Sequence, residues 1–442
     1  MKKRLFMFAT AALMLAACSN DGEVAVNDGA QLQSGSGAVA FDTYTSSATK
    51  AGAPGVMNTT QLQTTGFGVF ASLSNDGDYA TSIGPNFMYN QNVYYTANAW
   101  TYEPLKYWPN ETTADMLNAA GHASSTATDK LSFFAYAPYV GATTAGVVTA
   151  DNADTDNEAT PGSIEAGITA LSANNVNTDP KVSYTMAYTP AKSVDLLWGV
   201  APSGGLNYTA VNGTPISVAS GEPLINLVKP AKDQKIKFLF KHALARLGLT
   251  VVAAVDQIAP GGTIAAETKI FVNSVTIEDA SAVKRLAPTG VLNLNNSSAG
   301  IANWTLGAKE KFKLVVDKTT RDNINPDLLS SGNGVTTAEK AVIKDSKYFM
   351  IIPTEGNAKA EFKITIDYDV VTTDASLVGE KSSVNNVIWK TIEVGDNTNG
   401  FTNNKAYSLK LILGLTSVKL EAEVADWEVD GSINVDLPRN EE

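Results

Sequence analysis

Cysteine and histidine, the side chains behind much nucleophilic, acid–base and metal chemistry, are scarce in this chain. Its 442 residues include one cysteine, Cys18, and two histidines, His122 and His242. One cysteine cannot form an internal disulfide or a cysteine-based zinc site, and two histidines leave very little for histidine-based metal or acid–base chemistry. These counts exclude much of enzyme chemistry before any motif is considered.

The remaining reactive groups lack the neighbours that would make a catalytic or metal site. His242 follows Lys241 in a largely apolar run, where we expect a packing residue, and His122 stands in a loop of Gly, Ala and Ser. The acidic stretch 151–158 lacks the glycine and the distal glutamate of a calcium loop, so we expect solvated surface. No strand-to-helix Gly-x-Ser-x-Gly turn occurs, and no pair of carboxylates is singled out. The sequence therefore predicts a protein that is not an enzyme and uses no cofactor and no metal.

The amino terminus has the pattern of an export signal. Basic residues at positions 2–4 precede an apolar run, residues 5–17, that is too short to span a bilayer. The run ends in Leu-Ala-Ala before Cys18, which resembles the lipobox of bacterial lipoproteins, where diacylglycerol alkylates the thiol. We therefore expect a signal peptide over residues 1–17 and a lipid anchor on Cys18. The alternative is a free cysteine behind an ordinary signal peptide.

The composition is that of a folded, acidic protein. Hydrophobic residues make up 44% of the chain and charged residues 18%, so there is enough apolar surface to bury. The net charge of -12 argues against a nucleic-acid partner, because phosphate binding needs a surplus of Lys and Arg. A length of 442 residues accommodates two large β-sandwich domains.

Short strands follow one another through most of the chain, and sustained helical periodicity is nearly absent. In the clearest strand, residues 362–370, every second residue is apolar, as one buried sheet face requires. The same alternation occurs at 235–240, 407–413 and 418–424, whereas 66–70 and 131–136 are apolar enough to be buried on both faces. The sequence therefore predicts an all-β fold.

The composition also suggests how the chain is divided. Residues 18–37 are polar and small, which predicts a flexible tether. Only eight of the 33 Lys and Arg residues precede Val228, and a polar hinge follows at 229–234. We therefore expect an N-terminal β-sandwich domain over residues 38–230 and a C-terminal β-sandwich domain over residues 231–442.

Several short sequence segments in both halves resemble the fimbrillin family, the lipoprotein pilins of Bacteroidales surface pili. In chain order they are Trp100, Tyr-Trp-Pro at 107–109, the apolar strand 131–139, Asp-Leu-Leu-Trp at 195–198, the strand 238–247, Asn-Lys-Ala-Tyr at 404–407 and Val-Ala-Asp-Trp at 424–427. The resemblance implies two transthyretin-like β-sandwich domains in tandem. It also implies export as a lipoprotein, trimming by a trypsin-like protease and polymerisation by exchange of a β-strand, in a stalk, anchor or tip subunit.

Strand exchange requires a strand that can leave, because its removal opens a groove that a neighbour's strand can fill. Segment 38–50 begins with alternating apolar residues and ends at Lys50, the first basic residue after the signal peptide. Cleavage between Lys50 and Ala51 would release this segment with the tether and the lipid. The family often uses an Arg-specific protease, yet the first Arg after the signal is Arg246. Cleavage after lysine and no cleavage at all are therefore the alternatives.

Exchange also requires a donor strand, and the chain end is a candidate. In residues 431–438, the side chains of Ile433, Val435 and Leu437 would lie on one side of an extended strand. The alternative is that this segment is simply the last strand of the second domain.

An aromatic-rich stretch allows a second interpretation of function. It contains Tyr94, Tyr95, Trp100, Tyr102, Tyr107 and Trp108. The resemblance to the fimbrillin family assigns the Trp108 region to the core, so we expect core packing here, although exposed rings could instead stack on sugars.

Together these patterns predict a structural or adhesive pilus subunit assembled by β-strand exchange. Its expected partners are other copies of itself or related pilin subunits, the outer membrane before processing, and a host or bacterial surface glycan or protein, with no nucleic acid. We expect it on the outer membrane surface and, after processing, in an extracellular pilus. The alternative is a monomeric, surface-anchored glycan-binding lipoprotein. The sequence does not separate stalk, anchor and tip subunits.

Overall fold

The computed structural model describes residues 38–435 apart from internal segments. These segments are 46–55, 76, 110–128, 144–145, 147–152, 155–165, 175, 212, 232–233, 255–266, 298–302, 310–311, 319–323, 355–359, 395–399, 415–417 and 427–432. Strands dominate the described residues, which confirms the prediction of an all-β fold. Within these residues, no helix combines the length and apolar character needed to cross a bilayer.

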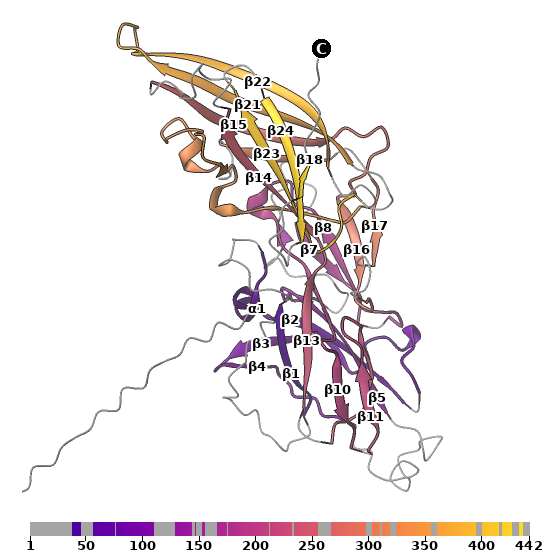
Figure 1. The fold of residues 1–442 in the computed structure, drawn as a ribbon. Helices are drawn as coiled ribbons and strands as arrows, with labels where there is room; N and C mark the ends of the chain where they lie inside the picture. The colour runs from indigo at the N-terminus through magenta and orange to yellow at the C-terminus, as the bar shows by residue number, and fades with distance from the viewer. Residues whose placement is uncertain are drawn as a thin grey trace, which may run out of the picture.

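The first sheet has eight strands and lies in the half of the molecule formed mainly by N-terminal residues (Figure 1). Its order is β1-β13-β9-β5-β2-β3-β4, with β12 paired to β5. The strands are β1 (Ala40–Thr45), β2 (Phe67–Ser74), β3 (Met88–Thr96), β4 (Ala99–Thr101), β5 (Lys130–Ala137), β9 (Leu197–Val200), β12 (Leu224–Leu227) and β13 (Lys235–His242). The short hairpin β10 (Leu206–Thr209) and β11 (Pro215–Val218) lies in the same half.

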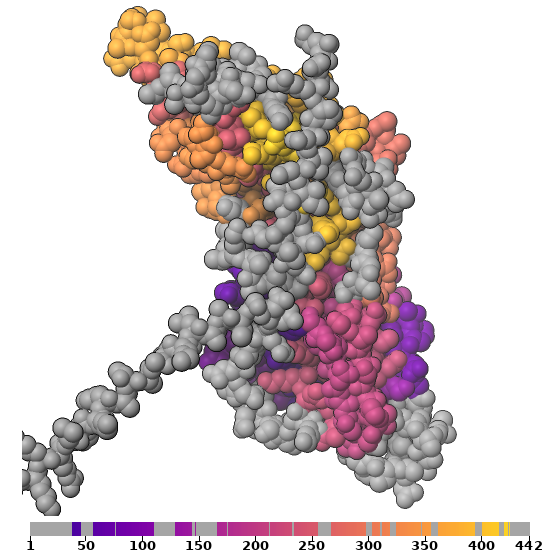
Figure 2. Space-filling model, viewed as in Figure 1, coloured from indigo at the N-terminus to yellow at the C-terminus, as the bar shows by residue number. Residues whose placement is uncertain are grey.

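Two sheets form the other half. A six-stranded sheet has the order β19-β14-β23-β24-β25, with β20 paired to β14, and a four-stranded sheet has the order β18-β15-β21-β22. The strands are β14 (Ala245–Ala253), β15 (Thr268–Asp279), β18 (Lys313–Asp317), β19 (Lys340–Ala341), β20 (Phe349–Ile351), β21 (Ala360–Thr373), β22 (Lys381–Val394), β23 (Lys405–Leu413), β24 (Val418–Asp426) and β25 (Ile433–Val435). In the space-filling view these C-terminal strands occupy one end of the molecule and the N-terminal strands the other (Figure 2).

A five-stranded sheet takes strands from both halves of the chain. Its order is β17-β16-β8-β7-β6. The strands are β6 (Ala153–Asp154), β7 (Ala166–Leu171), β8 (Lys181–Thr185), β16 (Thr289–Asn293) and β17 (Trp304–Leu306). β13 also crosses the expected division near residue 230, because it follows that residue and still pairs in the first sheet. Two sheets therefore combine strands from before and after residue 230.

One α-helix is present among the described residues. This helix, α1 (Thr59–Thr65), begins at Asn58, whose side chain accepts a hydrogen bond from the Gln61 N–H at 3.0 Å. It ends at Gly66, whose φ of 69° favours glycine. Short 3-10 turns occur at η1 (Thr81–Ile83), η3 (Pro190–Lys192), η4 (Pro326–Leu328) and η5 (Lys344–Ser346).

The first sheet separates two hydrophobic cores. On β5, Phe133 and Ala135 pack into the smaller core, whereas Phe134 and Tyr136 pack into the larger one. This confirms that residues 131–136 are buried on both faces. The larger core continues into the C-terminal half, where Phe362, Ile364, Ile366 and Tyr368 of β21 are buried, as the alternation of residues 362–370 predicts.

Gly68 on β2 provides a test of packing between the first sheet and the larger core. A Cβ atom at this position would lie 2.2 Å from Cε1 of Tyr136, whose hydroxyl donates to Asn90 Oδ1 at 2.7 Å. Because the buried ring has to shift, we expect Gly68→Ala to lower the free energy of unfolding by about 1–3 kcal/mol, measured by urea denaturation. Gly77→Ala is the matched control, since a Cβ atom at Gly77 would lie 3.8 Å from its nearest neighbour, the Asn75 carbonyl oxygen. Equal stability of the two variants would contradict this packing.

Candidate functional site

Strand β1 closes the first sheet. It pairs in parallel with β13 over its whole length, Ala40–Thr45. On its other side the Val39 N–H donates to the Lys106 carbonyl at 2.9 Å, and Ala38 forms an antiparallel bridge with Tyr107. The segment just after β4 therefore meets the residues that directly precede β1, and this contact brings the two ends of the sheet together.

The inward side of β1 is buried among aromatic rings. Its inward residues are Phe41, Thr43 and Thr45. These residues and Val39, which directly precedes the strand, are each at most 6% exposed. The ring centroid of Phe41 lies 5.4 Å from that of Tyr102 and 5.8 Å from that of Phe133. It lies 6.2 Å from Phe238 and 6.3 Å from Phe67. We call these four rings the Phe41 pocket.

Tyr102 connects the Phe41 pocket to the main chain just before β1 and to the main chain just after β4. Its hydroxyl donates to the Val39 carbonyl at 2.7 Å, and its oxygen accepts from the Lys106 N–H at 3.2 Å. Burial raises the pKa of Tyr102 to about 12, although its hydrogen bond with the Lys106 backbone lowers the pKa in part. The phenol therefore stays neutral at physiological pH and holds β1 against the chain after β4.

A buried polar cluster fixes the chain downstream of β1. The Met57 N–H donates to Asp195 Oδ2 at 2.9 Å, and the same oxygen lies 2.8 Å from His242 Nδ1. His242 is the last residue of β13, so the cluster connects Met57 to the strand that pairs with β1. The hydroxyl of Thr45, the last residue of β1, lies 3.1 Å from the hydroxyl of Thr59, the first residue of α1. We call Met57, Asp195 and His242 the Asp195 clamp.

The two titratable side chains of the Asp195 clamp are buried. His242 is 4% exposed and Asp195 is 2% exposed. Across the described part of the chain, no group of three or more His, Cys, Asp and Glu residues could hold a metal ion. The placement of His242 fits the packing role expected from the sequence. Its pairing with Asp195 was missed, because no local pattern connects residues 47 positions apart.

Several residues that the sequence singles out lie outside the described residues. These are the lipidation site Cys18, the cleavage pair Lys50 and Ala51, the donor residue Leu437, His122 and most of the acidic stretch 151–158. Their roles stay predictions. On either side of residues 46–55, which are outside the described residues, Thr45 and Met57 are held by hydrogen bonds to Thr59 and Asp195.

The other two candidate donor residues belong to the last strand of the described residues. Ile433 and Val435 lie in β25, which pairs antiparallel with β24 at the edge of the six-stranded sheet. The pairs join Ile433 to Val424 and Val435 to Ala422. Both interpretations of this segment, donor strand and final strand, stay predictions.

The aromatic-rich stretch is mainly part of the core. Trp100, Tyr102 and Trp108 are buried, which confirms core packing for these three. Tyr94 and Tyr107 are exposed by 37% and 54%. Because both tryptophans are buried, neither of their rings is exposed to stack on a sugar.

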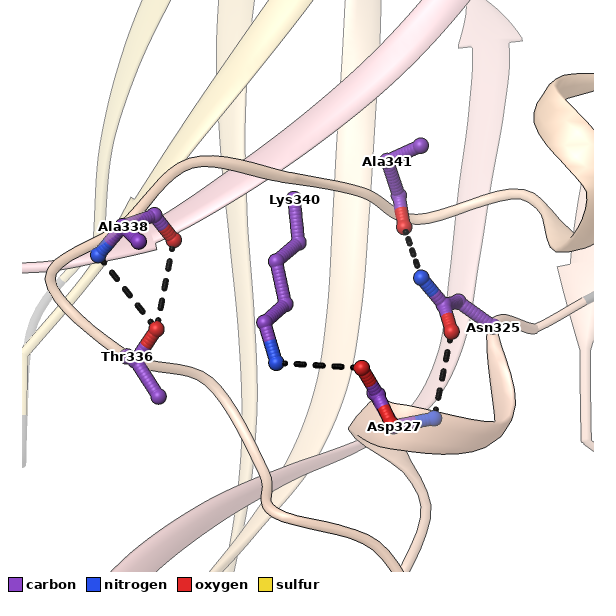
Figure 3. A network of polar contacts seen from close by, with 6 residues as sticks. All are labelled: Asn325, Asp327, Thr336, Ala338, Lys340 and Ala341. Carbon is purple, nitrogen blue, oxygen red and sulfur yellow. Dashed lines mark hydrogen bonds and ion pairs between the residues drawn. The ribbon is translucent and has the colours of Figure 1, made fainter.

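A second polar cluster connects η4 to β19 (Figure 3). The Asn325 amide donates to the Ala341 carbonyl at 3.1 Å, and its oxygen accepts from the Asp327 N–H at 3.1 Å. Lys340 Nζ lies 3.2 Å from Asp327 Oδ2, and the Thr336 hydroxyl contacts the backbone of Ala338. These contacts join neighbouring turns of one loop and assemble no catalytic group, so β1 and its groove remain the candidate site.

The raised pKa of Tyr102 predicts alkaline loss of stability. Its ordinary pKa is 10.0, so between pH 10 and about 12 the unfolded state binds fewer protons than the folded state, and stability falls as pH rises. Tyr102→Phe should remove this contribution, on the order of 3 kcal/mol, from the difference in unfolding free energy across that range. Tyr107→Phe, at the exposed neighbour, should retain most of it, because burial is the main cause of the rise and the charge of Tyr107 adds only a smaller part. Identical pH profiles for Tyr102→Phe and the wild type would contradict the assignment.

Comparison with known proteins gives relatives that match most of the chain. It is 22% identical over 451 residues to the fimbrium subunit Fim1C of Phocaeicola vulgatus, covering 99% of this chain and 100% of that protein. The crystal structure of a fimbrial protein from Bacteroides vulgatus superimposes with a TM-score of 0.55 and 19% identity, covering 88% of this chain and 99% of that one. No family model matches. Over nearly its whole length, then, the chain is similar in sequence to a fimbrium subunit and in fold to a fimbrial protein, which confirms its resemblance to the fimbrillin family.

Proposed function

We propose that the protein is a structural or adhesive subunit of a surface pilus that assembles by exchange of β1. It is exported as an outer-membrane lipoprotein on Cys18, cut between Lys50 and Ala51, and joined to other pilin subunits. Similarity to a fimbrium subunit along 99% of the chain supports the pilus role. The observation that carries strand exchange is the position of β1, a terminal strand between β13 and the chain after β4.

Loss of β1 would leave a groove that needs a new strand. The facing edge of β13 and the Lys106 carbonyl would lose main-chain partners, at a cost of about 1–3 kcal/mol for each group that stays buried. The Phe41 pocket would lose its occupant, and exposing one such side chain costs about 1.5–3 kcal/mol. An extended segment from a neighbour would restore both kinds of contact.

The connections of β1 to the body would allow it to leave after one cut. On its C-terminal side it joins the rest of the fold through residues 46–55, which include Lys50. The Asp195 clamp and α1 hold the chain from Met57 onward. A cut after Lys50 would therefore separate β1 covalently and leave the downstream chain attached to the body.

The chain end supplies the donor in this proposal. β25, which pairs with β24 through three residue pairs, would leave the edge of the six-stranded sheet, and the segment 431–438 that contains it would enter the groove of a neighbouring subunit. The body would keep two transthyretin-like sandwich domains in tandem. Since β13 completes the first sheet and β14 begins the next, we place their division between these strands.

Replacing the cleavage lysine tests maturation. We expect Lys50→Ala to leave folding intact and to abolish polymers, since β1 would stay covalently attached in its groove. Intact mass and amino-terminal sequencing of protein sheared from cells, with electron microscopy of filaments, measure the effect. Wild-type protein should begin at Ala51. Lys181→Ala, at an exposed lysine of β8, is the matched control and should polymerise normally. Filaments of normal length from Lys50→Ala would refute maturation at this position.

Replacing the cysteine tests lipid anchoring. We expect Cys18→Ala to prevent acylation, because the thiol is the acceptor for diacylglycerol, and so to prevent membrane attachment and surface display. Palmitate labelling, membrane fractionation and antibody labelling of intact cells measure these three steps. The Lys50→Ala precursor is the control and should remain lipidated. Undiminished surface labelling of Cys18→Ala cells would disprove the lipoprotein proposal.

A further inference from the structure

The groove that holds β1 has positions of unequal size. The Phe41 pocket takes a whole aromatic ring, which is 3% exposed and has four ring neighbours within 6.3 Å. Two residues further along, Thr43 is 4% exposed, and its hydroxyl oxygen has no hydrogen-bond partner. Thr45 contacts the Thr59 hydroxyl at 3.1 Å. From its N-terminal end the groove therefore takes one aliphatic, one aromatic and two small side chains at alternate positions.

The outward side of β1 contributes little to the choice between donor strands. Lys237 Nζ lies 5.3 Å from the ring centroid of Tyr44, and the Tyr44 hydroxyl accepts from the Ser203 N–H at 3.1 Å. A lysine next to the groove favours an acidic or an aromatic neighbour equally well. Selection between donor strands therefore depends on the inward positions, and mainly on the aromatic one.

The chain's own tail does not match this pattern. After Trp427 the sequence contains no aromatic residue, and its alternating apolar side chains are Ile433, Val435 and Leu437. With Val435 at the Thr43 position, which suits it because valine and threonine have the same shape, Ile433 would occupy the Phe41 pocket. Any other register also places a smaller or charged side chain there. An aliphatic side chain cannot fill a space shaped by four rings, and the resulting cavity weakens binding.

We propose that the groove selects a donor strand with an aromatic side chain at the Phe41 position and small side chains at the Thr43 and Thr45 positions. This inference rests on the proposed strand exchange and narrows its partner. The preferred donor is a segment of a different pilin subunit, and another copy of this chain is a poor donor. The tail of this chain then serves the groove of another subunit type, so that subunits alternate or occur singly in the polymer.

The test uses the full chain with a site for a sequence-specific protease in place of residues 47–52. After the cut, the protein is incubated with synthetic peptides, and release of the original β1 fragment is followed by native mass spectrometry. The peptides are an isotope-labelled β1 peptide (residues 38–46), its Phe41→Ala version and its Asp42→Ala version, the latter as a control on the outward side. The tail peptide (residues 431–438) is compared with its Ile433→Phe, Val435→Phe and Leu437→Phe versions.

We expect the labelled β1 peptide and the Asp42→Ala control to exchange equally well. Phe41→Ala and the unmodified tail should bind roughly 10- to 100-fold more weakly, because the aromatic pocket stays partly empty. At least one tail peptide with a phenylalanine should recover most of that loss. Equal binding of the unmodified tail and the β1 peptide, or of Phe41→Ala and the β1 peptide, would overturn aromatic selection while leaving strand exchange intact. Failure of the labelled β1 peptide to enter the cut protein would instead overturn strand exchange, and aromatic selection with it.

Discussion

The first sheet depends on a strand at its end that is held from both sides. β1 gives β13 a partner along its free edge and meets the chain after β4 through Val39 and Lys106. The inward face of β1 also covers the aromatic rings of the smaller core. Because buried main-chain groups need partners and buried rings need cover, the sheet requires a strand in this position.

β1 packs mainly against one of the two hydrophobic cores. Val39 and Phe41 belong to the smaller core, whereas only the partly buried Tyr44 of β1 packs against the larger one. The larger core runs from the back of the first sheet, through the five-stranded sheet, into the C-terminal half. Removal of β1 would therefore affect mainly the smaller core, and the larger core would lose only the contact with Tyr44. This arrangement is compatible with a strand that can be replaced while the body stays folded.

Polar groups in this protein hold segments together. The Asp195 clamp connects the chain before α1 to the end of β13, and Tyr102 connects β1 to the chain after β4. In the described part of the chain, the cluster around Asp327 likewise joins adjacent turns (Figure 3).

The sequence by itself determined the strands and the faces that they bury. The alternation at residues 362–370 and the apolar run at 131–136 have the burial that a two-residue period predicts, because the period is a local property of an extended chain. Only the tertiary structure decided which strands meet. Nothing near Phe41 indicates that its ring packs against Phe238, and nothing in β16 indicates that it pairs with β8. These contacts join residues more than a hundred positions apart, and their partners are selected by shape, register and burial in the whole fold.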